Sequence, residues 1–269
     1  MRASCRLMQG GFAASLAAVA LAGAAAAADM SAREMTERLF KADAAGAHLD
    51  FSRMMLTELD LSGVDFKQAR LEGTDLFGSD LSGANLSSTD LTSARLDRTI
   101  LIGAKFDHAR LAGASILRPT TFAGMDATRA EAVSFAGADL RNTKIFGRFN
   151  YANFAGADLS GSTLAPFNHT GFIEHLWRTE LAGADLSGAN FAGANLGHVK
   201  FRFANLRGAN LTRTILRNAD FAHADLSGAD LTGADIAAAD FDGAILTGAK
   251  GLDTLAGRAG ATNMDKVIQ

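Results

Sequence analysis

Three side chains of the kinds that bind metals lie in one short segment of the sequence. His169, Glu174 and His175 supply imidazole and carboxylate groups, which are the nitrogen and oxygen ligands that Zn²⁺ takes in proteins. Their spacing does not match the pairs that a helix places on one face. The lone cysteine, Cys5, offers no cysteine-based site. We therefore expect no metal site.

Catalytic chemistry has no clear position in the chain either. Serine and aspartate recur throughout the sequence, so no serine, histidine and acid can be singled out as a triad. The glycines also recur at regular spacing and form no separate phosphate-binding loop. The sequence therefore predicts a protein that is not an enzyme and that holds no cofactor.

The only tryptophan marks a candidate contact for a partner. Phe172 and Ile173 stand four residues before Leu176 and Trp177, a spacing that indicates a short helix. In one interpretation this apolar group packs against the rest of the protein. In the other, Phe172, Ile173 and Trp177 bind a partner, because projecting loops often carry function and tryptophan is a common hot spot.

A second candidate surface is acidic. A basic cluster between Lys200 and Arg217 is followed by acids at every fifth position, and Asp242 adds one more. These acids form a solvated wall, or they make an acidic docking surface, or they imitate the phosphate spacing of DNA. We expect them to ring the protein instead of forming one stripe: Asp220, Asp225, Asp230, Asp235 and Asp240.

The elements that must position these residues follow from a five-residue period. Leucine or phenylalanine recurs at this spacing from Phe51 to Ile116 and again from Leu181 to Leu246. A straight helix would spread such residues around its axis, and a straight strand would send alternate ones to opposite faces. A chain that keeps them inside must bend once per repeat, and stacked bends predict a solenoid.

Smaller residues agree with this interpretation. The position two before each large apolar residue is mostly alanine, which fits an inward site near a corner. Glycine often stands two positions after it, as a tight turn requires. Proline cannot donate to a ladder, and Pro119 and Pro166 both fall where the period breaks.

Phrases such as Ala184-Asp185-Leu186-Ser187-Gly188 resemble the consensus of the pentapeptide-repeat family. The resemblance extends over residues 49–250. It implies an all-β solenoid, a right-handed quadrilateral parallel β-helix with four repeats per coil. About 35 repeats would make about nine coils and a rod roughly 40 Å long. Some members resemble duplex DNA, bind type II topoisomerases and protect them from quinolones.

The segments outside the period have their own predictions. Residues 1–28 have the pattern of a Sec-type signal peptide with cleavage after Ala28, and retention as an anchor helix stays open. Residues 29–48 form a helical cap that begins with a capping box at Ser31 and Glu34. Two loops, at 117–134 and 165–179, interrupt the β-helix of repeats. Residues 251–269 form a second cap or a disordered tail.

Together these features predict an exported protein, periplasmic or secreted, that presents a rigid wall and loops to an unknown protein partner. Loss of Arg2 and Arg6 with the signal would change the formal net charge from −3 to −5, which argues against direct nucleic-acid binding. The mature chain would have no membrane span, and it could be a monomer or a homodimer. The alternative is a DNA-mimicking binder of a type II topoisomerase.

Overall fold

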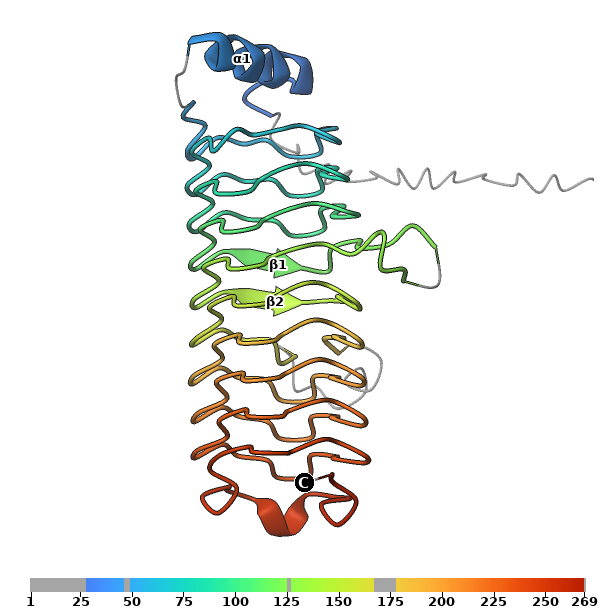
Figure 1. Ribbon diagram of the computed structural model, residues 1–269. Coiled ribbons are helices and arrows are strands. Elements are labelled where there is room, and N and C mark those ends of the chain that lie inside the picture. Colours follow the sequence, from blue (N-terminus) through green and yellow to red (C-terminus); the bar gives the residue numbers. More distant parts are fainter. Residues whose placement is uncertain (1–27, 46–48, 125–126, 167–177, 269) are drawn as a thin grey trace, which may run out of the picture.

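The computed structural model describes residues 28–45, 49–124, 127–166 and 178–268. The chain forms a rod of stacked coils with a helix over its N-terminal end (Figure 1). The regular elements are α1 (Ala32–Ala45), β1 (Ser115–Leu117), β2 (Lys144–Phe146) and the 3-10 helix η1 (Arg258–Gly260). None of the described helices combines the length and the hydropathy that a membrane crossing requires.

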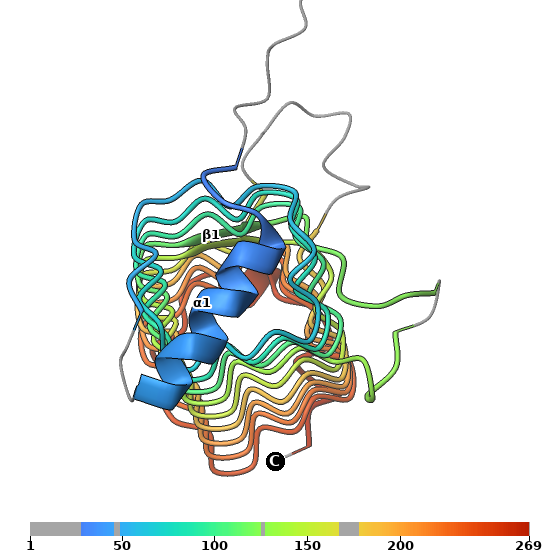
Figure 2. The same cartoon turned by 90° about the horizontal axis from the view of Figure 1, so that it is seen from above.

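The rod has four faces, each made by one column of parallel bridges (Figure 2). Bridged residues in regular coils are 20 positions apart, as in the pair of Asp50 and Arg70, so four five-residue sides make one coil. In the described residues each column has ten levels, counted from the N-terminal end. The first face runs from Asp50 to Lys250, the second from Met55 to Ala256, the third from Asp60 to Thr262 and the fourth from Asp65 to Ile268.

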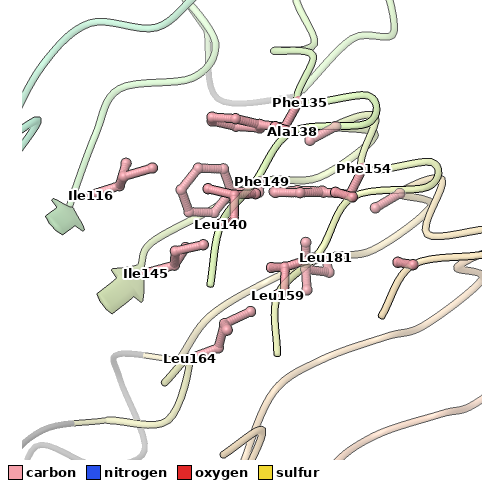
Figure 3. Packing of buried hydrophobic residues seen from close by; sticks show 14 of the residues in the cluster. Ile116, Phe135, Ala138, Leu140, Ile145, Phe149, Phe154, Leu159, Leu164 and Leu181 are labelled. Atoms are coloured by element: carbon pink, nitrogen blue, oxygen red, sulfur yellow. The ribbon is translucent and has the colours of Figure 1, made fainter. Parts of the chain in front are cut away.

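The large apolar residue of each repeat points into the rod and makes the core (Figure 3). Phe201, Phe221 and Phe241 form one internal column, as their spacing of 20 predicts. The ring centroids are 4.9 and 5.0 Å apart and the rings are stacked. A second column on the fourth face stacks Phe135 on Phe154 at 4.9 Å. In most repeats after the first coil the smaller inward residue is also buried, which leaves room for the stacked rings.

In the regular coils the corners are β-turns whose third residue has positive φ, a conformation that costs glycine little. Some corners need glycine for a second reason, because a large side chain of the preceding level lies against them. A Cβ on Gly183 would lie 2.6 Å from the ring of Tyr151, and one on Gly243 would lie 2.6 Å from the ring of His223. At these corners a large residue is followed one level later by glycine.

Helix α1 closes the N-terminal end of the core. The Ser31 hydroxyl accepts the Glu34 backbone N–H at 3.2 Å and caps the helix start. Met35 and Leu39 on the inner side are 0% and 4% exposed. Asp29 exchanges hydrogen bonds with the backbone N–H and C=O of Met55, at 2.6 and 2.7 Å, so part of the first open ladder edge is satisfied.

The C-terminal end is closed by a wider coil. After Lys250 the bridged residues are Ala256, Thr262 and Ile268, so each side has six residues instead of five. Leu252, Leu255, Ala261, Met264 and Val267 pack against the core. Residues 251–268 therefore continue the ladders and form the tenth level.

The first of the two loops that interrupt the ladders is shorter than the sequence pattern predicts. Thr120 still bridges to Ile100, three residues beyond the expected start of the first interruption, and Ser134 bridges to Lys105. The insertion is thus confined to residues between Thr120 and Ser134. The second insertion separates Thr163 from Glu180 on the adjoining face.

Candidate binding surfaces

The structure does not describe the apolar group around the only tryptophan. Phe172, Ile173 and Trp177 lie outside the described residues, as do His169, Glu174 and His175. Within the described ranges, no group of three or more histidine, cysteine or acidic side chains could hold a metal ion. The partner-binding role of the apolar group stays a prediction.

The acids near the C-terminal end occupy successive faces, as the ring interpretation expects. Asp220 and Asp240 lie on the third face, Asp225 on the fourth, Asp230 on the first and Asp235 on the second. In each of them Oδ1 accepts the backbone N–H two residues later, at 2.9 to 3.1 Å. This bond stabilises the following corner, so the repeated acid has a structural role at every level.

The basic cluster before these acids is paired with them across the levels. Arg202 contacts Asp220 at 3.4 Å, Arg207 contacts Asp225 at 2.8 Å, and Arg217 contacts Asp235 at 2.6 Å. The change from basic to acidic residues along the sequence is therefore a set of ion pairs between neighbouring levels. These pairs interrupt the negative surface that an imitation of duplex DNA would need.

We predict that stability falls in acid because of these corner carboxylates. The Thr232 hydroxyl and backbone N–H donate to Asp230 at 2.6 and 2.9 Å and hold the pKa of its carboxyl below the ordinary value. Burial raises the pKa of Asp225, but hydrogen bonds from Ser227 and the charge of Arg207 outweigh it. A lowered folded pKa gives stability above the unfolded value, about 3.9, that is lost as pH falls through the folded value.

Urea unfolding between pH 7 and pH 2 measures this effect, with Asp230→Asn as the matched variant. An asparagine already fills the same position at Asn210, where its oxygen accepts the Thr212 N–H at 3.0 Å. The variant should keep nearly full stability at pH 7 and lose less than the wild type below about pH 4. Equal acid sensitivity of the two proteins would contradict the assigned role of Asp230.

The third face contains the one place in the described ladders where two successive levels are not bridged. It lies between Thr120 and Arg148, next to the first insertion. The Thr121 hydroxyl donates to the Arg148 carbonyl at 2.6 Å, and Arg148 bridges in turn to Glu180. The two insertions thus leave the rod beside the fourth and sixth levels of this face, with Arg148 on the fifth level between them.

A cavity of about 380 Å³ opens at this break. Its described lining includes Arg118, Arg148 and Arg178, with Glu180 as the only acid and with Phe122 among the apolar residues. Sequence reasoning did not single out these arginines, because they lie 30 positions apart and regular coils repeat every 20. Their positions beside the register breaks were the available signal.

A smaller cavity of about 180 Å³ lies on the second face, where Pro166 begins the second insertion. Its lining includes His198, Ile215 and Arg217. Ile215 is 44% exposed and is one of the few large apolar side chains on the wall. Both of these cavities therefore lie beside an insertion.

Comparison with known families identifies the repeats. The sequence model of pentapeptide repeats matches eight copies over residues 39–76, 79–116, 179–218 and 214–250, more than half of the chain. The fold of these repeats is the right-handed quadrilateral β-helix, and the four bridge columns agree with it. No curated relative matches the chain.

Several solved structures are similar to it. HetL, a pentapeptide repeat protein involved in heterocyst differentiation regulation from the cyanobacterium Nostoc sp. strain PCC 7120, is 30% identical, with 87% of this chain and 98% of HetL covered and a TM-score of 0.35. Rfr23 from the cyanobacterium Cyanothece 51142 is 26% identical over 45% of this chain and 90% of its own, with a TM-score of 0.28. Trypsin-treated QnrB1, a plasmid-mediated fluoroquinolone resistance protein, is 19% identical over 76% and 93%, with a TM-score of 0.46.

Proposed function

Because this chain belongs to the pentapeptide-repeat family, we propose that it is an exported, non-enzymatic scaffold that binds a macromolecular partner. The rod supplies a rigid support, and the surface beside the two insertions supplies the contacts. The partner is a protein that meets the third face and its neighbouring corners. Residues 1–28 direct export in this proposal and are removed.

The proposal rests on a difference between the regular wall and the break on the third face. Polar side chains of the wall hydrogen-bond to the backbone of their own corners, whereas polar side chains at the break line a cavity. On the wall, aspartate and asparagine are bound to their own corners, as Asp185 is to the Ser187 N–H at 3.1 Å. The core is filled with apolar residues. At the break, in contrast, the ladder opens and arginines line a cavity. Specific recognition is best supported where the repeat is interrupted.

Affinity capture from the exported fraction tests the proposal. The full chain is compared with a variant in which Phe172, Ile173 and Trp177 are replaced by serine. We expect one partner to be retained by the wild type and at least tenfold less of it by the variant, because apolar and aromatic anchors carry most interface energy.

The matched control is Phe40→Ser, which removes an aromatic side chain that is 75% exposed on helix α1, at the N-terminal end of the rod. It should retain the partner as the wild type does. Equal capture by the wild type and the triple variant would remove the tryptophan segment from the proposal. Recovery of the unprocessed chain in the cytoplasm would contradict export.

A further inference from the structure

We propose that the cavity at the third-face break binds a small organic dianion, such as a phosphate monoester with a flat apolar group. This inference goes beyond the proposed scaffold function, since it concerns a low-molecular-weight ligand and needs no macromolecule. The cavity volume of about 380 Å³ falls in the range of small-molecule sites, about 300–1,000 Å³.

Charge is the first argument. Three guanidinium groups and one carboxylate appear in the described lining, from Arg118, Arg148, Arg178 and Glu180. The positive charges exceed the negative ones by two. Guanidinium groups bind phosphate and carboxylate oxygens in pairs of parallel hydrogen bonds, so a dianion matches both the charge and the donors.

The second argument is a buried donor that lacks an acceptor. Arg178 Nε is covered from solvent and has no hydrogen-bond partner in the structure as described. Buried N–H groups are nearly always satisfied in folded proteins. An oxyanion in the cavity that Arg178 lines would supply the missing acceptor.

Arg148 is the second arginine positioned to bind the anion. Its Nε lies 3.2 Å from Glu180 Oε2, and its guanidinium lies over the Phe122 ring at 4.4 Å from the centroid. Asn150 holds Glu180 from the other side, with Nδ2 3.2 Å from the same oxygen. The hydrogen bond of this ion pair is donated by Nε.

The apolar part of the lining defines the remainder of the ligand. Pro119, Phe122 and Phe146 contribute to the wall. Inorganic phosphate is far smaller than the cavity and would leave this surface uncovered. An aromatic group on the phosphate would cover it, so we expect phenyl phosphate to bind more tightly than inorganic phosphate.

Isothermal titration calorimetry of the full chain at low chloride concentration tests the inference with three probes. Phenyl phosphate should bind with one site per chain and at least fivefold more tightly than inorganic phosphate. Benzyl alcohol, which keeps the ring and lacks the charge, should not bind measurably. Arg178→Gln and, separately, Arg148→Gln should each weaken phenyl phosphate binding at least tenfold.

Arg213→Gln is the matched control, because it removes one arginine from a corner of the first face, away from the cavity. It should bind phenyl phosphate like the wild type. Thermal unfolding of each variant shows whether it is folded, and Arg178→Lys, which keeps the charge without the planar donor group, should still bind more weakly than the wild type. Absence of binding to the wild type, or equal weakening by Arg213→Gln, would overturn the inference. Partner capture by the scaffold would be unaffected by that result.

Discussion

Phe221→Ala is expected to destabilise the rod by about 3–5 kcal/mol, because it removes the middle ring of a buried stack. Phe221 is 0% exposed and lies between Phe201 and Phe241 at centroid distances of 4.9 and 5.0 Å. The backbone on either side is held by ladder bonds, so the levels cannot close over the space. Urea unfolding followed by circular dichroism measures the loss.

Phe203→Ala is the matched control for this prediction, because it deletes the same kind of side chain 18 residues earlier in the sequence, on the outside of the rod. Phe203 is 62% exposed and contacts the ring of His223 at 5.1 Å. We expect it to change the unfolding free energy by less than about 1 kcal/mol. Similar losses of unfolding free energy in both variants would show that the buried stack does not stabilise the rod more than an exposed ring does.

Gly251→Ala is expected to open the wide last coil and to cost at least about 2 kcal/mol. Gly251 has φ 75°, and a Cβ there would overlap the backbone N and Cα of Thr232. Backbone held in a ladder cannot move aside as a flexible side chain can. Hydrogen exchange should show faster exchange at the amides that tie the last coil to the ninth level: Ala256, Thr262 and Ile268.

The matched variant is Gly248→Ala, three residues earlier. Gly248 has φ 68°, but a Cβ there would meet nothing within 4 Å. It should cost only the roughly 1–2 kcal/mol of a left-handed residue with a Cβ and leave the three amides protected. Loss of protection in both variants would mean that backbone conformation, and not close approach, limits the last coil.

The regular part of the fold was predictable because one physical requirement repeats. A bend every five residues, with Leu186 inside and Asp185 on the wall before the corner, leaves few other ways to bury the apolar residues. Even the Phe201 to Phe241 stack followed from a spacing of 20. The handedness came from the family resemblance, since periodicity does not determine it.

The ends and the breaks were less predictable. After Lys250 each side has six residues instead of five. No regular spacing of apolar residues in the sequence predicts this change. The break on the third face depends on how many residues each insertion adds, and that number decides which side chains become neighbours. Arg118 and Arg148 meet there only because the first insertion lengthens the coil that separates them. The structural role of the acids was also missed, because the sequence pattern does not show that each carboxylate accepts a hydrogen bond from its own corner.

The pairing of large corner residues with glycine one level later has a consequence for how the chain finds its register during folding. A repetitive sequence can misalign by whole repeats with little loss of core burial. A slip of one repeat toward the N-terminus would place Tyr151 over Arg178 instead of Gly183 and His223 over Ala238 instead of Gly243, so each would meet a side chain. A slip of one repeat toward the C-terminus would place them over Gly188 and Gly248. These corners therefore disfavour coils that slip in one direction, and they reduce the number of misaligned rods that a repetitive sequence can form.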